Sequence, residues 1–120
     1  MTDLEAMLAS IPMFRSLGVR QQARLAQLFC RRTYQPGAVI VRQGDTSMSF
    51  YVVLSGMLTV SQVSRGPQGV LRPGDYFGEV ALAMNMPRTA SVRALTPATV
   101  ASCDRKTFDE LVRHLFADDA

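Results

Sequence analysis

Apolar residues recur at helical spacing over the first thirty positions of the chain. The run that starts at Thr2 has the spacing of a capping box, in which the side chains of Thr2 and Glu5 satisfy each other's backbone donors, and Pro12 ends the run. Between residues 19 and 31, apolar residues recur every three or four positions, and Arg and Gln occupy the other side of the predicted helix. The pattern therefore predicts two helices, the second over 19–31.

After Gln35 the pattern changes to short runs of β-forming residues separated by Gly, Pro, Asp and Ser. The predicted strands are 38–42, 50–54, 57–63, 68–71, 90–95 and 99–103. Six or more short strands at this spacing predict a sandwich, a jelly roll or a barrel. A closing helix over 105–116, capped by Asp104, completes a mainly β fold with flanking helices.

The size and composition predict one globular domain. A chain of 120 residues has room for one hydrophobic core, so we take 1–120 as a single unit with a helical segment (1–33), a β-roll (34–104) and a closing helix (105–116). The apolar share of 48% and the charged share of 19% are typical of folded proteins. The apolar runs are too short to cross a bilayer, and no export signal is recognised. We expect a cytoplasmic protein without a membrane span.

Few residues are available for metal or redox chemistry. Cys30 and Cys103 cannot form a four-thiolate site, and we expect both to be core or half-buried thiols in a reducing compartment. His114 is the sole histidine, which excludes a centre built on several imidazoles. The net charge of +3 comes from scattered Arg residues and not from a dense basic stripe, so a small phosphate ligand fits better than a nucleic acid.

The stretch 77–92 has the features of an anion site. Gly78 precedes a predicted short apolar helix that begins with Glu79, Pro87 ends that helix, and Arg88 follows just before the next strand. Without a Cβ at Gly78, a ligand can approach the backbone, and the N–H groups of the next turn point outward at the positive end of the helix. The planar fork of Arg88 suits the two exocyclic oxygens of a phosphodiester. The stretch therefore predicts a pocket for a sugar phosphate.

A carboxylate within an anion site narrows the choice of ligand. Glu79 would repel a phosphate unless it accepts a hydrogen bond from a ribose hydroxyl while Arg88 neutralises both groups. A ligand that carries a phosphate and a ribose hydroxyl side by side is a cyclic nucleotide. A plain surface ion pair between Glu79 and Arg88 is the structural alternative, which the surrounding residues disfavour.

The sequence resembles the cyclic-nucleotide-binding domain of the catabolite activator proteins, of the cAMP- and cGMP-dependent protein kinases and of nucleotide-gated channels. The resemblance covers residues 11–115 and is most specific at Phe77-Gly78-Glu79 and over 87–94, which match the family's phosphate-binding cassette without a gap. It implies an eight-stranded β-roll of jelly-roll type with N-terminal helices, a cassette (77–92) with a short helix, and a C-terminal helix. It also implies cAMP or cGMP as the ligand and no cofactor.

The resemblance assigns roles to the cassette residues. In the family, the acid at the position of Glu79 holds the ribose 2′-hydroxyl, and the arginine at Arg88 pairs with the cyclic phosphate. Backbone amides at Ala81 and Thr89 complete the phosphate cradle, next to Gly78.

The same resemblance bears on the base. A hydroxyl residue at the position of Thr89 is associated in the family with tolerance of cGMP, and a contact of Thr89 with the phosphate remains the alternative. Val60 and Leu71 are implied as part of the apolar wall beneath the base. Family members usually carry a further helix over the base, whereas only residues 117–120 follow the predicted closing helix here. We therefore expect an open pocket that discriminates poorly among bases.

Three function classes come into question for this sequence. The first is a regulatory sensor in which cyclic-nucleotide binding moves the terminal helices. The second, a cupin-type metalloenzyme, needs more histidines than the chain has. The third is a degenerate domain that serves as a protein-interaction module. We expect no enzymatic activity, and no direct DNA binding because no helix-turn-helix follows the closing helix. The effector, the oligomeric state and whether the chain is part of a longer protein stay open.

Overall fold

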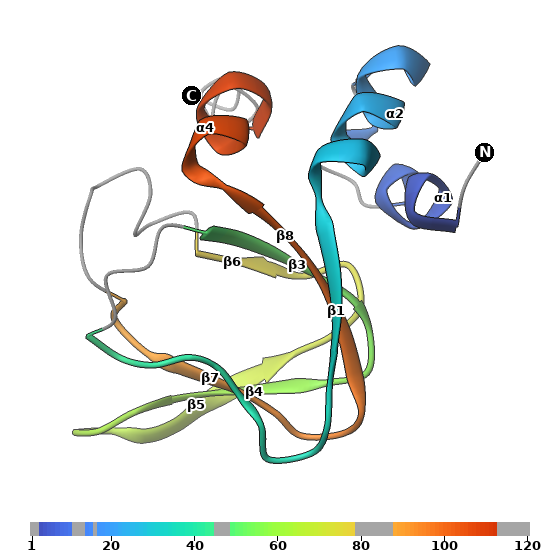
Figure 1. Ribbon diagram of the computed structural model, residues 1–120. Coiled ribbons are helices and arrows are strands. Elements are labelled where there is room, and N and C mark those ends of the chain that lie inside the picture. Colours follow the sequence, from blue (N-terminus) through green and yellow to red (C-terminus); the bar gives the residue numbers. More distant parts are fainter. Residues whose placement is uncertain (1–2, 11–13, 16, 45–48, 79–87, 113–120) are drawn as a thin grey trace.

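Two four-stranded antiparallel sheets lie one above the other, and helices cover the free side of one of them (Figure 1). The computed structural model describes residues 3–10, 14–15, 17–44, 49–78 and 88–112. The predicted cassette helix lies outside these residues. The expected fold, a mainly β roll of eight strands with flanking helices, is confirmed. Across the described ranges, no helix is both long enough and apolar enough to cross a bilayer.

The described part of the chain contains two helices, then eight strands, then a short helical segment. Two helices come first, α1 (Asp3–Ala9) and α2 (Val19–Leu28). The strands of the first sheet are, in spatial order, β1 (Cys30–Tyr34), β8 (Ala98–Asp104), β3 (Ser49–Ser55) and β6 (Tyr76–Phe77). Those of the second sheet are β2 (Val39–Val41), β7 (Ser91–Ala94), β4 (Leu58–Gln62) and β5 (Gly66–Leu71). After β8 come a single helical turn, α4 (Arg105–Thr107), and a π-helical segment, η2 (Phe108–Val112).

The first sheet separates two hydrophobic cores, whereas the chain length led us to expect one. Side chains alternate between the faces of a strand, so Phe50, Val52 and Leu54 of β3 point to the helices while Tyr51 and Val53 point to the second sheet. The outer core, on the helix side, consists of Leu8, Phe14, Leu25, Phe29, Phe50, Val52, Leu54, Ala101, Cys103 and Phe108. The inner core, between the sheets, consists of Val41, Val53, Leu58, Val92, Ala94, Ala98 and Val100.

The second helix is shorter than the sequence predicts. It ends at Leu28 instead of Arg31, because Phe29 takes an extended backbone while its N–H caps the carbonyl of Leu25. The residues that follow form β1, a strand that was not predicted, and pair with β8 from Cys30↔Ser102 onward. Helical periodicity is a local signal, whereas β1 depends on a partner about seventy residues further along the chain. The expected boundary between residues 33 and 34 therefore lies inside β1.

The closing helix expected over 105–116 is a single α-helical turn followed by the π-helical segment η2, and residues 113–116 lie outside the described ranges. The strands differ from expectation mainly at their ends. Gly66 and Pro67, expected in a turn, belong to β5. This is an edge strand, where a proline is tolerated although it has no N–H to donate to the sheet. The two-residue strand β6 is too short to give a sequence pattern. The cap at Asp104 is confirmed, since its carboxylate accepts a hydrogen bond from the Thr107 N–H at 2.9 Å. That bond holds the pKa of the Asp104 carboxyl below its usual value.

Gly56 lies in the turn after β3, which packs closely against the start of β8. A substitution at Gly56 tests this packing. The φ of Gly56 is +77°, and an added Cβ would lie 2.2 Å from the carbonyl oxygen of Pro97. Gly66 has a similar φ of +70° with nothing within 4 Å, so it is the matched control. We expect Gly66→Ala to lower the free energy of unfolding by about 1 kcal/mol and Gly56→Ala by about 3 kcal/mol. Urea denaturation measures both, and equal losses would contradict the packing described.

Candidate functional site

Arg88 is buried at the junction of β3 and β6. Only 5% of its surface is exposed, an unusual position for a charged side chain. Its Nη1 donates to the carbonyl of Gly78 at 3.2 Å, and its Nη2 donates to the carbonyl of Ser49 at 2.5 Å. The guanidinium carbon lies 5.8 Å from the centre of the Tyr51 ring, within the range of a cation–π contact. The side chain is therefore fixed in one orientation from several directions.

The antiparallel pairing of β3 and β6 brings these partners together. Tyr51 lies opposite Phe77, and their rings stack with 4.7 Å between centroids and 7° between planes. Because β6 ends at Phe77, Gly78 is the first residue beyond the strand, close to Ser49 at the start of β3. The Arg88 guanidinium binds to the main chain at both of these strand ends.

Gly78 lies against the start of β3 and the Arg88 side chain. We expected its missing Cβ to leave room for a ligand. In the structure, an added Cβ at Gly78 would lie 2.6 Å from the Ser49 carbonyl oxygen and 2.7 Å from Arg88 Nη1. The φ of +98° also favours glycine at this position. Arg88 therefore lies directly beside Gly78. The approach of a ligand to the backbone at Gly78 stays a prediction.

Hydrogen bonds from two other segments hold the main chain at Arg88 and Thr89. The Gly44 N–H donates to the Arg88 carbonyl at 2.8 Å, and Nε2 of Gln62 donates to the Thr89 carbonyl at 3.1 Å. The side chain of Thr89 is exposed. Strand β4 and the turn after β2 thus position the segment that carries the two predicted ligand contacts.

Sequence reasoning missed two glutamines of this arrangement. The backbone N–H of Gln43 donates to the Ser91 hydroxyl at 2.8 Å, and its Oε1 accepts from the Val63 N–H at 2.9 Å. Gln43 stands in the run Gln43-Gly44-Asp45, which supports the family resemblance without suggesting a role. Gln62 lies in a predicted strand, and nothing in the sequence alone indicates that its amide reaches Thr89.

The remaining predicted site residues fall into two groups. Val60 and Leu71 are half-buried and pack against the inner core, and Val60 lies opposite Val92 of β7. They therefore face the interior of the roll, on the second sheet, which also contains β7, the strand that follows the cassette. Glu79 and Ala81 lie outside the described residues.

This arrangement is suited to binding a small anion. A charge that is buried is screened less by water and salt than one at the surface, so it attracts an anion more strongly. The two carbonyl partners orient the Arg88 guanidinium. A planar, oriented guanidinium recognises phosphate or carboxylate oxygens.

Comparisons with known proteins agree with this chemistry. A model of the cyclic nucleotide-binding domain family matches residues 31–114. The cAMP-dependent protein kinase regulatory subunit of Schizosaccharomyces pombe is 35% identical over 108 residues, which cover 90% of this chain and 26% of that protein. The cGMP-dependent 3′,5′-cGMP phosphodiesterase A of Dictyostelium discoideum is 32% identical over 112 residues, 93% of this chain and 13% of that protein.

A solved structure gives the same result in three dimensions. The regulatory domain of Toxoplasma gondii PKA with cAMP superposes with a TM-score of 0.87 at 29% sequence identity, over 97% of this chain and 48% of that chain. The chain spans about a quarter of the length of the curated kinase subunits it matches.

The amide of Gln62 offers a test of how the cassette segment is held. We expect Gln62→Ala to speed hydrogen exchange of the amides over 88–91 about fivefold, because one hydrogen bond of about 1 kcal/mol is lost. Gln68→Ala is the matched control, since the partners of the Gln68 amide within the described part of the chain are nearby carbonyls of its own hairpin. Unchanged exchange in Gln62→Ala would show that Gln62 does not position the segment.

Proposed function

Because the chain belongs to the cyclic nucleotide-binding domain family, we propose that it binds a cyclic nucleotide, cAMP or cGMP, at the cassette (77–92) and passes binding on to an effector. The observation that carries the proposal is the buried, oriented guanidinium of Arg88. A cyclic phosphate has one negative charge and two exocyclic oxygens, which match a planar fork of donors. Relatives whose names include cAMP or cGMP support this ligand class.

The other ligand contacts are part of the proposal and come from the sequence. Glu79 holds the ribose 2′-hydroxyl, and the amides of Ala81 and Thr89 complete the phosphate cradle. Val60 and Leu71 form the apolar wall beneath the base, a role supported by their half-buried place beside the inner core.

The aromatic contacts supply a physical route from the cassette to the closing helix. Strand β6 leads directly into Gly78, and its two aromatic residues, Tyr76 and Phe77, lie against β3. The ring of Tyr76 is 5.8 Å from that of Phe50, which in turn is 5.4 Å from the ring of Phe108 in η2. A shift of Gly78 on nucleotide binding therefore reaches the start of the closing helix through packed rings. We propose that this contact moves the terminal helices when ligand binds.

The proposed role is regulatory and not catalytic. Several curated relatives that match most of this chain are named as regulatory subunits of a cAMP-dependent protein kinase. A degenerate domain acting only as an interaction module is not favoured, because the cassette keeps its glycine, acid and arginine. The two cysteines are free thiols, which is consistent with the cytoplasmic location we propose.

Replacing Arg88 tests the ligand assignment. We expect Arg88→Ala to weaken binding of cAMP and cGMP by about 3 kcal/mol, roughly a hundredfold, because a buried charge partner of the phosphate is removed. Arg88→Lys keeps the charge and loses the planar fork, so we expect an intermediate loss. Calorimetric titration of the purified chain measures both.

Arg93 on β7 is the matched control for Arg88. It is exposed and lies five residues further along the chain, and we expect Arg93→Ala to leave nucleotide affinity unchanged. Thermal unfolding confirms that each variant is folded. Equal affinity in Arg88→Ala and the parent would overturn the assignment.

The hydroxyl of Thr89 tests the choice of base. If it bonds the guanine amino group, Thr89→Ala weakens cGMP more than cAMP by about 1 kcal/mol, and Thr89→Ser restores the difference. Competition between the two nucleotides on each variant gives the result. Equal losses for cAMP and cGMP would instead make Thr89 a phosphate contact.

A further inference from the structure

A cavity of about 390 Å³ opens on the inner face of the first sheet, beside the edge strand β1. Its walls are Cys30, Arg31, Arg32, Tyr34, Ser49, Tyr51, Val100 and Ser102. These residues come from β1, β8 and β3, whose register places Cys30, Ser102 and Tyr51 in one row across the sheet. The volume is within the range of small-molecule sites.

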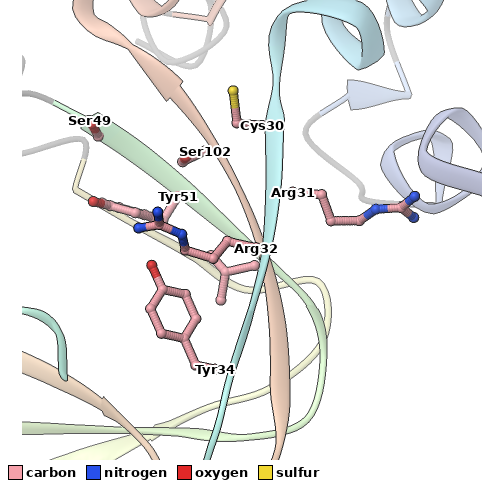
Figure 2. A pocket seen from close by; sticks show the side chains of 8 residues that line it. Cys30, Arg31, Arg32, Tyr34, Ser49, Tyr51 and Ser102 are labelled. Atoms are coloured by element: carbon pink, nitrogen blue, oxygen red, sulfur yellow. The ribbon is translucent and has the colours of Figure 1, made fainter. Parts of the chain in front are cut away.

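One cation points into this cavity. Successive side chains of a strand alternate between its faces, so Arg32 shares the inner face with Tyr34 while Arg31 does not. Figure 2 shows the side chains of Arg32, Tyr34 and Tyr51 converging on the same space, whereas Arg31 extends to the other side of β1. No carboxylate is among the described lining residues, and Arg32 is exposed.

The walls therefore offer hydrogen-bond donors around a positive charge. The guanidinium of Arg32 has five N–H donors, and hydroxyls of Tyr34, Ser49 and Ser102 lie around the same cavity. A guanidinium with hydroxyl donors beside it binds oxyanions, and phosphate or carboxylate groups fit its fork. Val100 and the phenol rings add an apolar surface for the rest of a ligand.

We propose that this cavity is a second ligand site, which binds the phosphate group of a small phosphorylated molecule through Arg32. The site does not depend on the nucleotide function proposed for the cassette. Its described lining includes neither Gly78 nor any residue of 88–92. Among the residues that the structure describes, the two sites share Ser49 and Tyr51, which contact Arg88 as well as the cavity.

Cys30 makes occupancy of the cavity measurable. Cys103 is buried as expected, but the expectation of a core or half-buried thiol is wrong for Cys30, which is an exposed free thiol in the cavity wall because it lies on the edge strand β1. Burial raises the pKa of the Cys103 thiol to about 12, so this residue stays protonated and unreactive near neutral pH. An uncharged alkylating reagent, iodoacetamide, therefore modifies Cys30 selectively in the full chain.

The experiment measures the alkylation rate of Cys30 against the concentration of phenyl phosphate and, separately, of inorganic phosphate at constant ionic strength. We expect phenyl phosphate to slow alkylation in a saturable way in the millimolar range. Protection by inorganic phosphate as well supports a site that recognises the phosphate alone, and protection by phenyl phosphate only supports a site that also uses the ring. Protection by neither probe overturns the proposal.

Neighbouring arginines provide the matched controls. We expect Arg32→Gln to weaken protection at least tenfold and Arg31→Gln to leave it unchanged, since these adjacent residues lie on opposite faces of β1. Tyr34→Phe, which removes one hydroxyl and keeps the ring, should weaken protection about fivefold. If protection of Cys30 survives Arg32→Gln but disappears in Arg88→Ala, the anion binds at the cassette and the proposal of a second site is overturned. If Arg88→Ala loses nucleotide binding but keeps the protection of Cys30, the second site stands.

Discussion

The hydrogen bonds from the Arg88 guanidinium to the carbonyls of Ser49 and Gly78 are the contact on which the candidate site depends. Burying an arginine is costly unless its donors are used, and these strand ends supply acceptors. The position is open to the guanidinium because Gly78 has no Cβ and adopts a positive φ. Tyr51 of β3, whose ring stacks on Phe77 of β6, lies against the same guanidinium. The first sheet thus positions the cassette arginine through the protein's own contacts.

The first sheet also explains how one small domain can connect a ligand site to helices. Its outer face carries the core shared with α1, α2 and η2, and its inner face carries the core shared with the second sheet. Neighbouring residues of β3 serve the two sides, since Phe50 packs on Phe108 while Tyr51 faces Arg88. Because protein interiors are close-packed, a displacement of side chains on one face of a strand also displaces those packed on its other face. The proposed transmission follows from this alternation.

Local patterns in the sequence predicted the features that depend on near neighbours. They indicated the cap at Asp104, the strand that contains Phe50 and the break between the strands predicted over 50–54 and 57–63. They failed where distant segments decide, as at residues 30–34, which continue a helical pattern but form β1 through pairing with β8. The amide of Gln62 reaches Thr89 across 27 positions, a contact that has no local signal. The family resemblance supplied the cassette, whose internal geometry at Gly78 only the structure could give.

The most direct measurement is an NMR titration of the chain, with isotope-labelled arginine side chains, by cAMP and by cGMP. If the cassette arginine binds the cyclic phosphate, the side-chain N–H signals of Arg88 shift with added nucleotide and saturate at one equivalent, while those of exposed Arg93 stay in place. The Arg88→Lys variant assigns the signal. Saturable nucleotide binding that leaves the Arg88 signals unmoved, or no binding of either nucleotide, would contradict the central role given to this side chain.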